Sequence, residues 1–426
     1  MTTAEHIDSY YAATANPAPR HPQLEGEITV DVCVVGGGLS GCSTALHLAE
    51  RGYRVALLEG RRIAWGASGR SGGQAIAGFA SSQDTLAAQV GLDDARRMWD
   101  VSVEAVELLQ GRVQRHAIDC DLHWGHMHVA VKPRHITELR AWRDEMTGTY
   151  AYPGTRWLTR DEVREWIASD RYLGGLYDPR SGHLHPLNYT LGLAAAAESA
   201  GARLFESSLV TRIDRGDPAT IVTATGQVRA RHVAICCNAW VDDLVPELRS
   251  RIMPVGTYIV ATEPLGEARM RALLREPIAV SDVNWVLDYF RPSADHRLLF
   301  GGRVSYSGLD PRNTGNATRL RMMRVFPQLG DARIEYAWGG YVDITMSRAP
   351  DFGRLAPNVY YLQGYSGHGI ALTGMAGKLV AEAIAGQAER FDLFTKLEHR
   401  NFPGGKQLRT PLLVLAMLWF RMKDLA

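Results

Sequence analysis

The feature that most constrains the fold is a glycine pattern near the N-terminus. Gly36, Gly38 and Gly41 stand in G-x-G-x-x-G spacing directly after residues 30–35, which are apolar except at one position. Such a run is typical of a buried parallel strand. The ten residues after Gly41 carry apolar side chains at helical intervals, and residues 54–58 are expected to form a second strand. Strand, glycines, helix and strand in this order predict a dinucleotide-binding βαβ unit.

Each part of this unit has a physical role. Gly36 permits the tight turn, Gly38 lets the backbone approach a pyrophosphate, and Gly41 lets the helix pack on the strand. The N–H groups at the start of the helix carry a partial positive charge that attracts phosphate. Glu59 follows the second strand, where its carboxylate can accept hydrogen bonds from ribose hydroxyls and would repel a 2′-phosphate. The motif alone does not distinguish FAD from NAD.

Composition and charge are those of an ordinary globular protein. Of 426 residues, 46% are apolar and 22% are charged, and the net charge of +1 gives no reason to expect nucleic acid as a partner. The five cysteines include the pair Cys236 and Cys237 in an apolar segment, so we expect buried thiols in a reducing compartment. Because neither a secretory signal nor a run long enough to span a bilayer is visible, we expect a cytoplasmic protein without membrane contact.

Helix and strand patterns alternate along the rest of the chain. A loop rich in glycine and serine is expected over residues 61–74. Helices are expected near residues 84–116, 136–146, 188–200 and 370–385. Strands are expected near residues 126–131, 204–205, 210–213, 220–223, 228–237, 254–262, 283–291, 297–304 and 359–362. The strand-like segments between residues 254 and 304 suggest one broad antiparallel sheet.

The order of these elements predicts a split nucleotide domain. Strand–glycine–helix units stand at both ends of the chain, around Gly36 and around Gly364. This predicts an α/β fold with an α+β insertion, in which a Rossmann-type domain is assembled from both ends of the chain around an antiparallel-sheet substrate domain. The second helix N-terminus could stabilise negative charge on a reduced flavin, which favours FAD over NAD. The expected segments are 28–90, 183–240 and 336–390 for the FAD-binding domain, 91–182 and 241–335 for the substrate domain, 1–27 for an N-terminal arm, and 391–426 for a tail with an apolar helix.

Several segments resemble one family of flavoenzymes. The segments are residues 9–13, 62–74, 183–188, 287–291, 361–369 and 402–405. They resemble the D-amino-acid-oxidase-like superfamily of FAD enzymes, and within it they are most similar to the γ-glutamylputrescine oxidases of bacterial putrescine use. The resemblance implies oxidation of the terminal primary amine of γ-glutamylputrescine or a related γ-glutamyl-polyamine. The products would be the aldehyde, ammonia and, with O2 as acceptor, hydrogen peroxide.

Departures from the wider superfamily refine this expectation. Val342 stands where the resemblance would place an arginine that clamps a substrate α-carboxylate, and valine cannot replace such a clamp. A free α-amino acid is therefore disfavoured as substrate. No cysteine follows Cys237 and no histidine lies in residues 61–74, so we expect non-covalent FAD. Residues 297–302 lack the lysine that activates oxygen in sarcosine oxidases, which leaves the electron acceptor open. The alternatives are a quinone-linked amino-acid dehydrogenase and an FAD-holding protein without turnover.

The candidate cofactor residues come from both glycine loops and the segments between them. They are Gly36, Gly38, Leu39, Ser40, Gly41, Glu59, Gly60, Arg61, Ala67, Ser68, Arg70, Gly72, Gly73, Gln74, Val210, Asn238, Trp240, Gly339, Gly364, Ser366, Gly367, His368, Gly369 and Ile370.

Aromatic residues are the main candidates for the substrate site, because a poorly hydrated pocket favours the uncharged amine that flavin chemistry needs. The candidate catalytic residues are His368, Tyr289 and Trp338. The candidate substrate-binding residues are Trp65, Tyr258, Trp285, Arg291 and Tyr365, with Arg291 a possible partner for the glutamyl carboxylate. About half of the aromatic residues are expected to be core.

Two further features have weaker functional interpretations. His123, His126 and His128 lie close together in sequence, but only two of them share a strand face, so no metal site is expected. Residues 411–420 form an apolar run that is too short to cross a bilayer. We expect this run to pack on the body of the protein or on a second copy.

Overall fold

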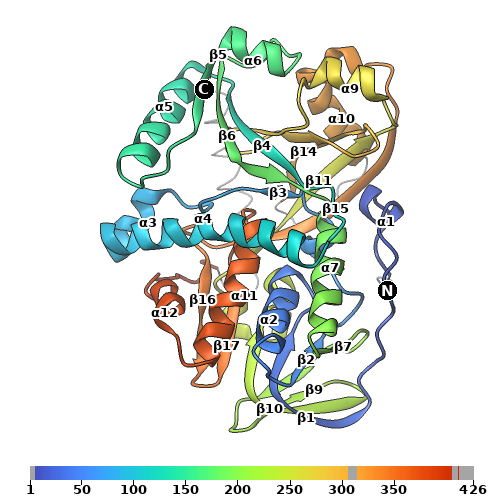
Figure 1. Ribbon diagram of the computed structural model, residues 1–426, viewed down its shortest axis with the longest axis vertical. Coiled ribbons are helices and arrows are strands. Elements are labelled where there is room, and N and C mark those ends of the chain that lie inside the picture. Colours follow the sequence, from blue (N-terminus) through green and yellow to red (C-terminus); the bar gives the residue numbers. More distant parts are fainter. Residues whose placement is uncertain (1–4, 306–313, 405–410, 412–426) are drawn as a thin grey trace.

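The computed structural model describes residues 5–305, 314–404 and 411. Two β-sheets form the body of the molecule, one in the lower half and one in the upper half of Figure 1. The long helix α4 (Leu92–Arg115) runs between them and packs on α11 (Ile370–Ile384). No helix among the described residues is long and apolar enough to cross a membrane. The apolar run 411–420 lies outside the described residues except for Pro411.

The first sheet brings together segments from both ends of the chain. The strand order β16-β17-β10-β1-β2-β7 places β1 between β10 and β2 in parallel pairs, and β17 runs parallel to β10. The predicted split Rossmann-type sheet is therefore present. Its strands are β1 (Gly26–Val35), β2 (Val55–Leu58), β7 (Arg203–Phe205), β8 (Arg212–Asp214), β9 (Ala219–Val222), β10 (Gly226–Ile235), β16 (Asp351–Ala356) and β17 (Val359–Gln363).

The second sheet is antiparallel apart from one parallel pair, β12 with β4. Its central order is β15-β11-β14-β13-β12-β4-β6-β3, with β5 beside β6. Its strands are β3 (Gln74–Ala75), β4 (His123–Ala130), β5 (Arg156–Thr159), β6 (Gly174–His183), β11 (Met253–Thr262), β12 (Ala279–Asp282), β13 (Tyr289–Pro292), β14 (Leu298–Ser305) and β15 (Ile334–Ile344). The predicted domain boundary at residue 336 falls inside β15, which pairs with β11.

Helices cover the sheets, and one predicted helix is wrong in its length. The segment 84–116 forms two helices, because Gly91 between them has a φ of +84°. α2 packs on α7 and α11 beside the first sheet, and α10 packs on β11, β14 and β15 of the second. The remaining helices are α1 (Tyr10–Ala13), α2 (Leu39–Ala49), α3 (Gln83–Val90), α5 (Pro133–Gly148), α6 (Arg160–Trp166), α7 (Pro186–Ser199), α8 (Pro246–Arg249), α9 (Glu267–Leu273), α10 (Thr314–Val325), α12 (Glu389–Thr395) and the short 3₁₀ segments η1 (Ala67–Gly69), η2 (Asn238–Trp240), η3 (Asp242–Leu244) and η4 (Pro327–Leu329).

The predicted strand 283–291 is also corrected. Only β13 at its end is a strand, and a separate strand, β12, precedes it. Between them the side chain of Asn284 donates a hydrogen bond of 2.8 Å to the carboxylate of Asp282, and the Asn284 backbone N–H donates a second one of 3.0 Å. This local turn interrupts the pairing that a continuous strand would make.

Candidate functional site

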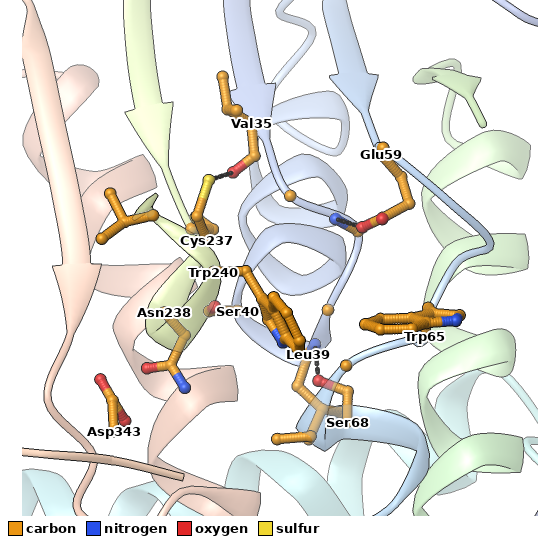
Figure 2. Close-up of a pocket in the computed structure, with 18 of the residues that line it drawn as sticks. Val35, Leu39, Ser40, Glu59, Trp65, Ser68, Cys237, Asn238, Trp240 and Asp343 are labelled. Carbon is orange, nitrogen blue, oxygen red and sulfur yellow. Dashed lines mark hydrogen bonds between the residues drawn. The ribbon is translucent and has the colours of Figure 1, made fainter. Parts of the chain in front are cut away.

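A cavity of about 720 Å³ opens where the parallel strands of the first sheet end. Val35 at the end of β1, Leu58 at the end of β2 and Cys236 after β10 all line it. Figure 2 shows the glycine turn, Glu59 and two tryptophans around this space. The carboxyl end of a parallel sheet is where ligands bind in such folds. The glycine motif predicted as a dinucleotide site therefore faces the main cavity of the described residues.

The glycines of the motif are required by close backbone contacts. Gly36 has a φ of +107°, and a Cβ there would lie 2.7 Å from the carbonyl oxygen of Cys236. A Cβ on Gly41 would lie 1.8 Å from the carbonyl oxygen of Gly36. A Cβ on Gly38 would lie 2.8 Å from Ser68 Oγ. Larger residues at Gly36 or Gly41 would collide with backbone atoms and displace the turn that shapes the cavity.

Glu59 lies at the end of β2 with its carboxylate at the glycine turn (Figure 2). Its oxygens accept hydrogen bonds from the backbone N–H of Gly37 at 2.7 Å and of Arg61 at 2.8 Å. Burial raises the pKa of Glu59, and these two hydrogen bonds oppose that rise. Each oxygen keeps a second lone pair, so the carboxylate fits the predicted role of binding ribose hydroxyls.

Two helices begin at the cavity, each directly after a glycine. α2 starts after Gly38, α11 starts after Gly369, and neither glycine supplies a side-chain cap. The Leu39 N–H at the start of α2 donates to Ser68 Oγ at 2.8 Å, and the next N–H groups of that turn remain. Both glycines line the cavity. Free N–H groups and a partial positive charge therefore face the cavity from both ends of the chain, as a diphosphate and an electron-rich ring require. Ser71 Oγ and Asn238 Oδ1 are buried and have no hydrogen-bond partner, which leaves further polar atoms for a ligand.

The glycine- and serine-rich loop 66–74 is held in place by two tryptophans. Trp65 lies between the guanidinium groups of Arg61 and Arg70, 3.9 and 4.0 Å from its ring centre. Trp338 Nε1 donates a hydrogen bond of 2.9 Å to the carbonyl oxygen of Arg70. The indole N–H of Trp338 therefore binds the backbone of the loop. In the structure this predicted catalytic residue holds the loop in place.

Arg291 is a correction to the sequence-based interpretation. Its side chain is buried, and its guanidinium donates to the carbonyl oxygens of Gly72 at 2.9 Å, Leu184 at 2.9 Å and Pro292 at 3.1 Å, and to Tyr11 Oη at 3.0 Å. These donors are directed at the protein's own atoms, so little of the group remains for a substrate carboxylate. Arg291 holds the loop, and sequence could not show this because Tyr11, Gly72 and Leu184 belong to three distant segments.

Asp343 is a site residue that the sequence analysis missed. It lines the cavity at the end of β15, and its carboxylate accepts a hydrogen bond from the backbone N–H of Gly364. Asn238 approaches the same carboxylate (Figure 2) and hydrogen-bonds to it. The Ser366 N–H donates to the Asp343 carbonyl oxygen at 3.0 Å. Burial raises the pKa of Asp343 to about 7. The residue therefore positions the second glycine loop.

Most predicted cofactor residues line the cavity, and the others lie outside its lining. Those lining it are Gly36, Gly38, Leu39, Ser40, Glu59, Gly60, Arg61, Ala67, Ser68, Val210, Asn238, Trp240, Gly367, Gly369 and Ile370. Those outside the lining are Gly41, Arg70, Gly72, Gly73, Gln74, Gly339, Gly364, Ser366 and His368. Lining residues that sequence reasoning did not select as cofactor residues include Gly37, Cys236, Cys237, Tyr341, Val342 and Thr373.

The predicted substrate residues fall into separate places. Trp65 and Tyr365 line the cavity. Tyr258 is buried beside Gly339, where a Cβ would meet its ring at 2.9 Å. Trp285 is 40% exposed beneath the guanidinium of Arg348, and it lies outside the cavity lining. The structure therefore does not gather these aromatic residues into one pocket.

Tyr289 belongs to the second sheet, and His368 belongs to the second glycine loop. Tyr289 is on β13, and its ring packs against Gly72, where a Cβ would lie 2.6 Å from Cε2. His368 is in the second glycine loop, with Nε2 3.2 Å from the carbonyl oxygen of Ala77.

Among the described residues no group of three or more His, Cys, Asp or Glu could hold a metal ion.

Known proteins resemble the whole chain. Residues 31–383 match the family described as FAD dependent oxidoreductase. Gamma-glutamylputrescine oxidoreductase of Escherichia coli is 43% identical over 421 residues, covering 99% of each protein. The probable oxidoreductase OrdL of Haemophilus influenzae is 38% identical over 99% of this chain and 98% of its own length. The crystal structure of glycine oxidase from Geobacillus kaustophilus has the same fold, with a TM-score of 0.72 at 23% identity over 84% of this chain and 95% of that one.

Proposed function

The chain belongs to the family of FAD-dependent oxidoreductases, and on that premise we propose that it oxidises the terminal primary amine of γ-glutamylputrescine or a related γ-glutamylated amine. The products would be the γ-glutamylated aldehyde and ammonia. Support comes from the similarity to gamma-glutamylputrescine oxidoreductase, which extends over 99% of both chains. FAD is the cofactor of this family, and the glycine turn, Glu59 and the two helix N-termini fit it.

The observation that carries the proposal is Val342. Its side chain comes from β15 and lines the cavity at the position where the resemblance would place a carboxylate-binding arginine. Arg61 is the one lysine or arginine among the described lining residues, and it follows Glu59 at the ribose end of the predicted site. At the Val342 position an α-amino acid would therefore find no bidentate partner for its carboxylate, whereas a plain CH₂–NH₂ terminus needs none.

The residues of the chain have distinct tasks in this mechanism. When bound, FAD supplies the acceptor for two electrons from the substrate carbon. The N-termini of α2 and α11 would stabilise negative charge on the bound cofactor, because their N–H groups carry a partial positive charge. Arg291 and Trp338 fix the loop 66–74 through the carbonyl oxygens of Gly72 and Arg70. Asp343 fixes the opposite loop through the N–H of Gly364. These contacts preorganise both walls of the site.

Oxygen as the electron acceptor, non-covalent FAD and a cytoplasmic location are further parts of the proposal. All five cysteines are free thiols, which fits a reducing compartment. Burial raises the pKa of each of these thiols, which disfavours reaction as thiolates. The alternative acceptor is a quinone, and its use would convert the same amine oxidation into a dehydrogenase reaction.

The test is a product assay with purified FAD-loaded protein. Peroxide and aldehyde would be measured with γ-glutamylputrescine, γ-glutamylspermidine, free putrescine and D-alanine under air. We expect both products only with the γ-glutamylated amines. Aldehyde without peroxide, obtained when a quinone is added, would support the dehydrogenase alternative. Turnover of D-alanine alone would contradict the interpretation of Val342.

A further inference from the structure

Polar side chains form a row across the second sheet. Backbone pairing sets Gly301 of β14 opposite Tyr289 of β13, Tyr289 opposite Ser281 of β12, and Ser281 opposite His128 of β4. Paired residues of adjacent strands point to the same face of a sheet. His126 shares this face because it lies two residues before His128 on β4. The intervening residues on β4 and β13, Met127 and Phe290, lie in an apolar core on the other face.

The row faces the cofactor side of the molecule. The ring of Tyr289 lies over Gly301, where a Cβ would come within 2.1 Å of Cζ, and it also packs on Gly72 of the cofactor loop. His368 in the second glycine loop is near enough for its charge to lower the pKa of both His126 and His128. The polar row of the second sheet therefore lies opposite the loops that enclose the predicted flavin site.

Ser281 fixes the orientation of the two imidazoles. Its Oγ lies 3.3 Å from His126 Nε2 and 3.2 Å from His128 Nδ1. A hydroxyl has one proton, so it can donate to one ring while it accepts from the other. When Ser281 donates to His126, His128 carries its proton on Nδ1 and presents Nε2 as a hydrogen-bond acceptor. The ring of His128 is held further by Trp142 of α5, with ring centres 5.0 Å apart.

Three polar atoms of the row have no hydrogen-bond partner among the described residues. One of them, His126 Nδ1, is buried. The other two, the Tyr289 hydroxyl and His128 Nε2, belong to side chains that keep some exposed surface although their strand neighbours are buried. These two atoms are therefore available to a ligand that enters between the sheets.

Two charged groups share this face, and the protein's own atoms bind both. Asp178 of β6 pairs with His126, and its carboxylate accepts hydrogen bonds from Tyr152 Oη, Ser181 Oγ and the Arg180 backbone N–H. Arg291 lies two residues after Tyr289 on β13, and its guanidinium donates to backbone carbonyl oxygens and to Tyr11 Oη.

Besides Asp178, the groups near His126 and His128 are each other, His368, Ser281 and Trp142, and His183 of β6 with Arg291 beyond it. Burial lowers the pKa of His126, His128 and His368, so these imidazoles are uncharged at neutral pH. Asp282 points to the opposite face, where Asn284 binds its carboxylate. The surroundings therefore favour an uncharged ligand over an ammonium ion.

We propose that His128 and Tyr289 form the subsite for the terminal amine of the substrate, and that this subsite takes the amine in its uncharged form. The inference rests on the proposed function and names the residues that select the reacting group. His128 Nε2 and Tyr289 Oη accept hydrogen bonds from the two N–H groups of the amine. Ser281 and His126 are positioning residues, because they act through the ring of His128.

The chemistry of the reaction agrees with such a subsite. An alkylammonium has a pKa of about 10.4, so it gives one proton to solvent before it binds, and the electron pair of that N–H bond stays on nitrogen. A C–H bond of the neighbouring carbon then breaks, and its hydrogen leaves with the electron pair to the oxidised FAD. The nitrogen lone pair forms the C=N bond of an iminium ion, which water hydrolyses to aldehyde and ammonia. Hydrogen bonds that use only N–H donors leave this lone pair free.

The test compares His128→Leu, His128→Gln and Tyr289→Phe with wild-type FAD-loaded protein. His232→Gln is the matched control, because His232 is a half-buried histidine on β10 of the other sheet. One measurement is kcat/KM for γ-glutamylputrescine from pH 7 to 10. The other is the change in flavin absorbance on binding of two inhibitors, γ-glutamyl analogues that end in a hydroxyl or in a trimethylammonium group. Bound FAD and melting temperature report folding.

We expect wild-type kcat/KM to rise about tenfold per pH unit below the substrate pKa, because only the uncharged amine binds. The hydroxyl analogue binds and the trimethylammonium analogue does not. His128→Leu and Tyr289→Phe each lower kcat/KM and hydroxyl-analogue affinity about 10- to 100-fold with FAD content unchanged. His128→Gln retains much of both, because its amide oxygen can accept the same hydrogen bond, and His232→Gln stays within about twofold of wild type.

The inference is overturned if both His128→Leu and Tyr289→Phe stay within about threefold of wild type. It is also overturned if the trimethylammonium analogue binds wild type more tightly than the hydroxyl analogue. If His128→Leu loses FAD, the affinity of Tyr289→Phe for the hydroxyl analogue tests the subsite instead, because this substitution removes only a hydroxyl. A wild-type protein that holds FAD but oxidises no γ-glutamylated amine would instead overturn the proposed function, and this result is visible before any variant is measured.

Discussion

Two buried charged residues hold the loops on either side of the cavity. Arg291 binds the carbonyl oxygen of Gly72, and Asp343 binds the N–H of Gly364. Neither forms an ion pair with any residue that the structure describes. Each group is instead stabilised by the backbone and by neutral side chains, which are Tyr11 and His183 for Arg291 and Asn238 for Asp343. A charge bound in this way fixes backbone positions, because the backbone cannot move without leaving it unsatisfied.

Substituting Arg291 by lysine tests whether its role is structural. A lysine has one ammonium group in place of the guanidinium fork, so it cannot reach all four acceptors. We expect Arg291→Lys to lower the free energy of unfolding by about 2–4 kcal/mol and to reduce bound FAD, measured by denaturant unfolding and flavin absorbance. The KM of the FAD-loaded fraction should stay within about twofold of wild type. A large rise in KM at unchanged stability would restore the carboxylate-binding role.

Asp343 predicts a pH dependence of stability. Its pKa in the folded protein is about 7, above its ordinary value of 3.8. Folding therefore takes up a proton between these two values, so the stabilising contribution is fully present below pH 3.8 and is lost as the pH rises through 7. Asp343→Asn removes this pH-dependent contribution to the free energy of unfolding, because an amide does not titrate. Between pH 5 and pH 7 the stability of wild type relative to the variant should fall, with a limiting slope of about 1.4 kcal/mol per pH unit. Parallel unfolding free energies across this range would contradict the assignment.

Sequence predicted the residues whose role is set by local conformation. Gly36 and Gly41 are fixed by contacts inside one βαβ unit, which a short motif encodes. The roles of Arg291, Asp343 and His128 depend on neighbours from distant strands, and sequence spacing does not show those neighbours. His128 was considered there only as a metal ligand, whereas the sheet pairs it with Ser281.

At the scale of elements, the N-terminal arm is part of the site. α1 lies against the junction of the two sheets (Figure 1). Tyr11 is fully buried, contacts Trp338 with ring centres 5.2 Å apart, and accepts a hydrogen bond from Arg291. Tyr10 Oη donates to Asp295 at 2.8 Å. The arm therefore supports both residues that hold the cofactor loop, although it lies outside both sheets.

Tyr11→Ala should expose this dependence. Removing a buried aromatic ring leaves a cavity between α1, Trp338 and Arg291, so we expect a loss of about 3–5 kcal/mol in unfolding free energy and faster release of FAD. Tyr11→Phe keeps the ring and loses one hydrogen bond, so it should cost about 1 kcal/mol. Denaturant unfolding and the rate of flavin fluorescence increase on dilution measure both effects. Equal FAD release by the two variants and wild type would show that the arm does not support the loop.

Most elements could be placed from periodicity, and two errors have local causes. Gly91 divides the predicted helix 84–116 because its φ is +84°, and helical spacing of apolar residues continued across it. The Asp282–Asn284 turn ends β12 where β-forming residues continue in the sequence. The pairing of β12 with β4, which brings Ser281 to His128, joins segments about 150 residues apart and has no signature in sequence.

At the scale of the whole molecule, the two sheets contribute different parts of the candidate site. The first sheet provides the cofactor cavity from both ends of the chain, and the second provides a face of polar side chains opposite it. The same fold occurs in glycine oxidase, so the fold alone does not choose the substrate. In the proposed function, the choice depends on side chains of the second sheet, among them Val342 in place of an arginine clamp.

The most direct test of this account is anaerobic reduction of the protein-bound FAD. Rapid mixing with γ-glutamylputrescine, free putrescine, glycine or D-alanine would be followed by loss of the oxidised-flavin absorbance, which requires no assumption about the electron acceptor. The account predicts fast and complete reduction by γ-glutamylputrescine and reduction at least about 100-fold slower by the two amino acids. Fast reduction by glycine or D-alanine, with none by γ-glutamylputrescine, would contradict it.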